Sequence, residues 1–120
     1  DGLEKTLDAC TEMAIASAGG SMDGTNISDN GGWKKTFQKY GNGTRGMVLA
    51  GVKLDTAISF LSDGAPFVVR QSDRYVIVFS YNADFIRYYD PVQNKEIKTA
   101  RNTFEDECSK NGNEFYVWQK

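Results

Sequence analysis

The feature that most constrains the fold of this chain is a change in the spacing of its apolar residues near Gly64. Before Gly64, apolar residues recur three and four positions apart, as on one face of a helix. After it, they gather in short runs of aromatic and β-branched residues, as in strands. Helices followed by an antiparallel series of strands are typical of an α+β fold. We therefore expect N-terminal helices packed on one face of a mostly antiparallel sheet.

The individual elements follow from the same two patterns. The helical spacing predicts helices over Thr6–Ala18, Trp33–Tyr40 and Leu54–Leu61. The predicted strands are Pro66–Arg70, Tyr75–Tyr81, Phe85–Tyr89, Glu96–Thr99 and Phe115–Trp118, with a short extended piece over Met47–Val52. The run Tyr75–Phe79 is apolar at every position, which indicates a central strand covered on both faces. Asn102 or Thr103 is expected to cap a last short helix.

Length and composition indicate one globular domain spanning residues 1–120. The chain is 40% hydrophobic and 25% charged, and it is long enough to bury a core without metal or disulfide support. Its formal net charge of −2 argues against general binding of nucleic acids, which usually requires a basic excess. No apolar run approaches the roughly 18 residues that a membrane span needs. We therefore expect no nucleic-acid partner and no membrane insertion of this segment.

The chain contains no histidine. This excludes Ser-His-Asp and Cys-His catalysis, His-ligated metals and an imidazole pH switch. Asp23, Asn26 and Asp29 share a loop that invites comparison with a calcium site, but Lys34 stands where an EF-hand needs a bidentate Glu. We therefore expect no metal and no cofactor.

The second half of the chain carries an ordered set of features: a helix over Leu54–Leu61, the segment Gly64–Val69, a strand after Arg74, and the pair Asp90-Pro91. A helix containing Phe104-Glu105 comes last. This order resembles the C39 peptidases, the papain-like domains that cleave double-glycine leader peptides in bacterial exporters. In that family a catalytic His stands just before the first of two strands, and its partner Asp stands in an Asp-Pro pair after the second. Here Asp90 is present, and Arg74, sixteen residues earlier, occupies the His position.

The N-terminal helix extends the resemblance in either of two registers. In the first, Ala9-Cys10 matches a second family cysteine, which puts Thr6 at the position of the nucleophile. In the second, Cys10 itself is the nucleophile. In both registers catalysis fails, because a thiol or hydroxyl needs a base at neutral pH and the guanidinium of Arg74 is never deprotonated. The resemblance therefore implies a pseudo-peptidase with a degenerate site of Thr6, Cys10, Arg74 and Asp90.

Degenerate C39-like domains of exporters related to the haemolysin transporter are understood to bind unfolded cargo. The resemblance therefore implies a domain that binds a peptide or protein cargo, at the cytoplasmic face of a bacterial membrane transporter and within a larger transporter. The peptide-binding candidates are Trp33, Tyr75, Tyr81 and Tyr88, although aromatic residues in strands more often form the core. Asp90 is expected either to pair with Arg74 or simply to end a strand in an Asp-Pro turn.

Two alternatives stay open at this point. One is a secreted papain-like interaction or immunity module in which Cys10 and Cys108 form a disulfide, whereas two buried thiols would fit a cytoplasmic domain. The other is an active cysteine peptidase that uses Cys10 with an unusual base.

Overall fold

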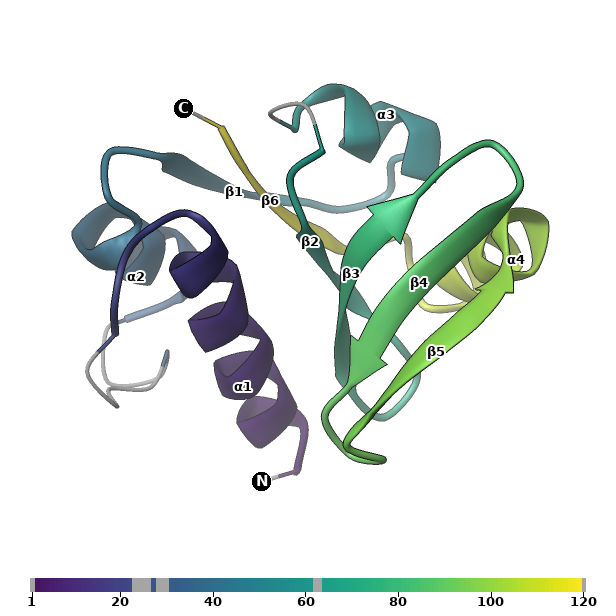
Figure 1. The fold of residues 1–120 in the computed structure, drawn as a ribbon, viewed down its shortest axis with the longest axis horizontal. Coiled ribbons are helices and arrows are strands. Elements are labelled where there is room, and N and C mark those ends of the chain that lie inside the picture. The colour runs from purple at the N-terminus through teal and green to yellow at the C-terminus, as the bar shows by residue number, and fades with distance from the viewer. Residues whose placement is uncertain (1, 23–26, 28–30, 62–63, 120) are drawn as a thin grey trace.

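The computed structural model describes residues 2–22, 27, 31–61 and 64–119. Its helices are α1 (Gly2–Ser17), α2 (Trp33–Tyr40), α3 (Leu54–Ser59) and α4 (Arg101–Lys110). Its strands are β1 (Arg45–Leu49), β2 (Phe67–Arg70), β3 (Tyr75–Tyr81), β4 (Phe85–Asp90), β5 (Lys95–Ala100) and β6 (Phe115–Gln119). All the strand pairs are antiparallel, and the sheet order is β1-β6-β2-β3-β4-β5 (Figure 1). The predicted α+β class is confirmed.

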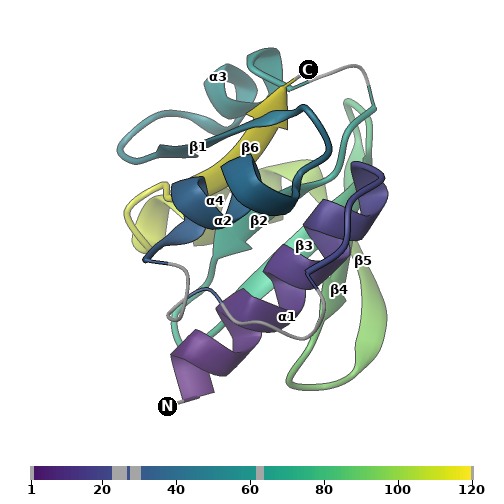
Figure 2. The same cartoon turned by 90° about the vertical axis from the view of Figure 1, so that its left-hand side faces the viewer.

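Helices cover both faces of the sheet, so the expectation of a single covered face is wrong. Alternate residues of β2, β3 and β6 enter two separate buried clusters. The first cluster contains residues of α1 and α2, which lie together on the near side of the sheet in Figure 2. The second contains residues of α3 and α4. The physical reason is that these three strands are apolar at successive positions, so each face needs its own cover.

β3 lies between β2 and β4, and its first four residues are buried, as expected of a central strand. The pairing with β4 shifts register between Val78 and Ser80, and there Phe79 turns 38% of its surface to solvent. Phe79 is therefore not part of the core, although its sequence context predicts it to be. The irregular pairing places Phe79 outside both clusters, whereas Tyr81, two residues further on, packs against the second cluster.

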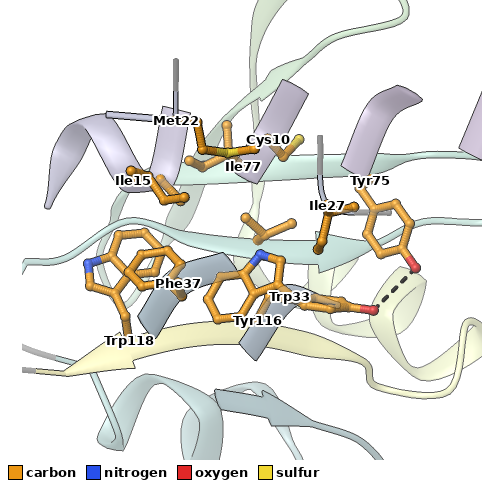
Figure 3. Packing of buried hydrophobic residues seen from close by; sticks show 12 residues of the cluster. Cys10, Ile15, Met22, Ile27, Trp33, Phe37, Tyr75, Ile77, Tyr116 and Trp118 are labelled. Carbon is orange, nitrogen blue, oxygen red and sulfur yellow. Dashed lines mark hydrogen bonds between the residues drawn. The ribbon is translucent and has the colours of Figure 1, made fainter. Parts of the chain in front are cut away.

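An aromatic stack joins α2 to the sheet (Figure 3). The ring of Phe37 lies 4.5 Å from that of Trp33 and 5.1 Å from that of Trp118. α2 approaches β1 so closely that a Cβ on Gly46 would lie 2.6 Å from atoms of both Phe37 and Trp33. A glycine at this position of β1 is therefore required by packing.

Two helix starts differ from their predictions. α1 begins at Gly2 rather than Thr6, and Leu3 packs against the first cluster. α4 begins at Arg101, and neither Asn102 nor Thr103 caps it. The reason is that Arg101 is already held in place, because its backbone N–H donates to Asp84 O at 3.0 Å and its guanidinium also pairs with Asp55.

The disulfide that the secreted alternative requires does not form. Cys10 belongs to the first cluster and Cys108 to the second, so the sheet separates two free, buried thiols. The calcium-like residues Asp23, Asn26 and Asp29 lie outside the described residues. Within the described ranges, no helix is both long and apolar enough to cross a bilayer.

Candidate functional site

Arg74 and Asp90 meet at one end of the sheet, since β3 begins just after Arg74 and the antiparallel β4 ends at Asp90. Nη1 of Arg74 donates to Oδ2 of Asp90 at 2.7 Å, which confirms the predicted contact. Nε and Nη2 donate to the two carboxylate oxygens of Asp73, at 2.9 and 3.2 Å. The bonds to Asp73 and Asp90 raise the pKa of Arg74 above its ordinary value. Arg74 is therefore a fixed cation and cannot accept a proton.

Asp90 also forms the turn that follows β4. Its Oδ1 accepts hydrogen bonds from the backbone N–H groups of Val92 at 2.9 Å and Gln93 at 3.3 Å. Its Oδ2 accepts a further bond from Nε2 of Gln93 at 3.1 Å, beside the bond from Arg74. The carboxylate is almost fully buried, with 4% of its side chain exposed. Both predicted roles of Asp90, the ion pair and the turn, are therefore confirmed.

Thr6 is the residue of α1 that touches the start of β3. Its hydroxyl donates to Leu3 O at 2.9 Å and accepts from the backbone N–H of Tyr75, also at 2.9 Å. Among the described residues, no hydrogen bond links this hydroxyl to Arg74 or Asp90. Thr6 thus reaches the backbone beside Arg74, and its hydroxyl has the role of a structural anchor.

Cys10 lies one helical turn further along α1 and is completely buried. Burial, reinforced by the negative charge of Asp90, raises the pKa of its thiol far above the ordinary value. A buried thiol of this kind stays protonated at neutral pH, and no substrate reaches it. The geometry therefore argues against a peptidase that uses Cys10.

The four aromatic candidates lie in different environments. Trp33 and Tyr75 are 3% and 5% exposed and belong to the first cluster, so they offer almost no surface to a peptide. The hydroxyl of Tyr81 donates to Ala65 O at 3.0 Å. Tyr88 is half-buried, and its ring centroid lies 5.4 Å from that of Phe104 in α4. Of the four, only Tyr88 lines the pocket beside the Arg74–Asp90 pair.

This pocket, which we call the Arg74 pocket, has a volume of about 340 Å³ and lies between the ends of β3 and β4 and helix α4. Hydroxyl and amide groups dominate its lining, among them those of Gln71, Thr99 and Thr103. The side-chain nitrogen of Gln71 is buried and has no hydrogen-bond partner within the described residues. The pocket therefore offers the side-chain amide of Gln71 as a hydrogen-bond donor to a ligand.

Negative charge exceeds positive charge in the Arg74 pocket. One guanidinium, Arg74, faces three carboxylates: Asp73, Asp90 and Glu107. None of the ion pairs among the described residues involves Glu107. Burial raises the pKa of the Tyr88 hydroxyl, the charges of Asp90 and Glu107 raise it further, and the guanidinium of Arg74 lowers it in part. The pocket thus has a negative potential that suits a cation.

Gln71, Thr99, Thr103 and Glu107 were not among the residues predicted from the sequence. A weak signal existed for two of them, because Thr103 and Glu107 stand four residues apart and share one face of α4 with Phe104. The described residues contain no group of three side chains able to hold a metal ion.

No family model, curated protein or solved structure matches this chain.

Proposed function

We propose that this chain is a non-catalytic, papain-like domain of the C39 type that binds a segment of a peptide or protein cargo. The setting we propose is an accessory domain of a bacterial export system, at the cytoplasmic face of a larger membrane transporter. The observation that carries the proposal is the partly buried ion pair of Arg74 with Asp90, together with Thr6 of α1, whose hydroxyl accepts from the backbone N–H of Tyr75, the residue after Arg74. These are the positions at which the C39 resemblance expects the base, its carboxylate partner and the nucleophile.

The chemistry of these three residues supports binding rather than catalysis. Acyl transfer needs a group that takes a proton from the nucleophile and returns it to the leaving amine. Arg74 cannot do this, Asp90 is occupied by four hydrogen bonds, and the chain has no histidine. The hydroxyl of Thr6 is bonded on both sides to backbone groups.

The Arg74 pocket supports a ligand with a positive charge. A lysine side chain fits a pocket of about 340 Å³, and its ammonium group would neutralise the unpaired carboxylate of Glu107. The rings of Tyr88 and Phe104 provide an apolar wall for the aliphatic part of that side chain. We therefore propose that the cargo segment presents a basic side chain to this pocket.

The test is a titration of the ¹⁵N-labelled protein with two flexible glycine-serine peptides that differ at one central residue, lysine or norleucine. Lysine should shift the amide signals of Gln71, Tyr88 and Glu107, and norleucine should leave them in place. Mass spectrometry should show that the peptide stays intact. Equal shifts with both peptides, or cleavage of either, would overturn the proposal.

A matched pair of variants locates the binding. Glu107→Gln removes the unpaired charge of the pocket and should weaken binding of the lysine peptide about tenfold, equivalent to about 1.4 kcal/mol. Asp106→Asn makes the same change one residue away on α4, at a residue that lines a different pocket, and should leave the affinity unchanged.

A further inference from the structure

The two edges of the sheet differ in how well they are protected against pairing with another strand. β5 forms one edge, and three of its six residues, Lys95, Glu96 and Lys98, are exposed and charged. Charged side chains, lysine above all, are a common device that prevents unwanted strand pairing. β1 forms the other edge and has one charged residue, Arg45, at its start. The β1 edge thus lacks the protection that β5 has.

β1 is an edge strand, so one side of its backbone faces away from the sheet. In the part of the chain that the structure describes, β1 has one strand neighbour, β6, with which it pairs from Arg45 to Leu49. Alternate N–H and C=O groups of an edge strand point away from its neighbour. Only another extended backbone supplies donors and acceptors at the matching spacing.

Most of the side chains beside this edge are apolar. Val48 is 46% exposed, the second most exposed of the large hydrophobic residues. It lines a shallow pocket of about 350 Å³ together with Leu7, Trp33 and Tyr116, and the exposed carboxylate of Glu4 lies at the same pocket. The indole nitrogen of Trp33 has no hydrogen-bond partner among the described residues, and Figure 3 shows it on the edge of the ring nearer Ile27, which lines the same pocket. An incoming strand thus meets an apolar surface as well as free backbone groups.

We propose that β1 is a docking site for an extended peptide segment, which adds to the sheet as a further strand and places apolar side chains over Val48 and the neighbouring pocket. The backbone supplies the hydrogen bonds, and the alternate side chains supply the preference for apolar residues. This site lies at the opposite edge region of the sheet from the Arg74 pocket and does not depend on the proposed function.

The experiment uses the whole chain and a synthetic peptide of alternating threonine and valine residues with a glutamate at each end, so that no basic side chain is offered to the Arg74 pocket. Binding should shift the amide signals of Arg45–Leu49 and slow their hydrogen exchange at least about tenfold. A second peptide with the same side chains and N-methylated backbone amides should not bind, because it lacks the donors that pair with β1.

Two variants with the same substitution serve as the matched pair. Val48→Lys places a charge on the exposed side of β1 and should weaken peptide binding at least about tenfold. Val92→Lys changes a 58% exposed valine in the turn after β4 and should leave the affinity unchanged. The inference is overturned if the N-methylated peptide binds as well as the first peptide. It is also overturned if millimolar peptide leaves the β1 signals unchanged or shifts those of Tyr88 and Glu107 instead, and in neither case is the lysine-norleucine test affected.

Discussion

The two faces of the sheet use alternate residues of the same strands but end in different surfaces. On the α1–α2 face, the stack of Trp33, Phe37 and Trp118 fills the space between helix and sheet. On the α3–α4 face, the apolar cluster stops at Val76 and Tyr88, and beyond them the Arg74 pocket opens. The closed face stabilises the fold, whereas the open end of the other face is lined by polar groups, including the buried side-chain nitrogen of Gln71, which has no hydrogen-bond partner among the described residues. The difference indicates where a ligand can bind without disturbing the core.

The difference comes from the length of the covering helices relative to the strands. α1 has sixteen residues and lies along β3, and α2 covers β1 beside it, so the two helices together cover the first cluster. α4 has ten residues, of which Phe104 and Cys108 are buried. The ends of β3 and β4 project past this short cover, and Arg74 and Asp90 stand there. A short helix over a longer strand thus leaves a pocket at the strand end.

The largest effect is expected from breaking the closed face. Phe37→Ala removes a fully buried ring that contacts two tryptophans, and it should lower the free energy of unfolding by about 3–5 kcal/mol. Urea unfolding followed by circular dichroism measures this change. Phe79→Ala, at a ring that is 38% exposed, is the control and should cost less than about 1 kcal/mol. Equal losses for the two variants would contradict the packing described for the first cluster.

A somewhat smaller effect is expected at the border of the open end. Asp90→Ala removes the buried carboxylate that accepts from Arg74, Val92 and Gln93, and it should lower the free energy of unfolding by about 3 kcal/mol. Asp73→Ala removes the other carboxylate bound to Arg74, which is exposed, and its effect should be much smaller. Should Asp73→Ala prove the more costly, the turn after β4 would not depend on the carboxylate of Asp90.

The sequence predicts the elements of this fold better than their layers. All the predicted helices and strands exist, because amphipathic spacing and β-branched runs are local signals. Coverage of both faces was missed, although the run Tyr75–Phe79 indicated it for one strand. The start of α4 was missed because long-range bonds of Arg101 to Asp84 and Asp55 decide it, and no local pattern reports such bonds.

The candidate site was predicted in part for a similar reason. The pairing of Arg74 with Asp90 follows from the sixteen-residue spacing across two adjacent strands, which the family resemblance supplied. The aromatic residues were harder to assign, because strand pattern alone does not tell which face of the sheet is open. Trp33 and Tyr75 face the first cluster and are buried in the core. Glu107 lines the pocket because α4 packs beside the ends of β3 and β4, which no local sequence pattern indicates.

The smallest effect is expected from ionisation of the two buried thiols at high pH. Cys10 lies on one face of the sheet and Cys108 on the other, so their contributions to stability compare the two faces. Burial raises the pKa of Cys108 from 9.0 to about 12, and it raises the pKa of Cys10 further still. At a pH between the two pKa values, the thiol stays protonated in the folded state and is ionised in the unfolded state, which favours unfolding. Each thiol therefore contributes stability that is fully present below pH 9.0 and is lost progressively above it, up to about pH 12 for Cys108.

At pH 10 each thiol should lower the free energy of unfolding by about 1.4 kcal/mol relative to pH 8. Urea unfolding at both pH values measures this loss of stability. In Cys10→Ala and in Cys108→Ala, the decrease in unfolding free energy between pH 8 and pH 10 should be smaller by about 1.4 kcal/mol. Because tyrosines also begin to ionise at pH 10, the difference between each variant and the unmodified chain is the quantity to compare. Equal differences for the two variants mean that both faces exclude water from their thiols equally well. A smaller difference for Cys108→Ala would mean that the opening beside α4 lets water reach the second cluster.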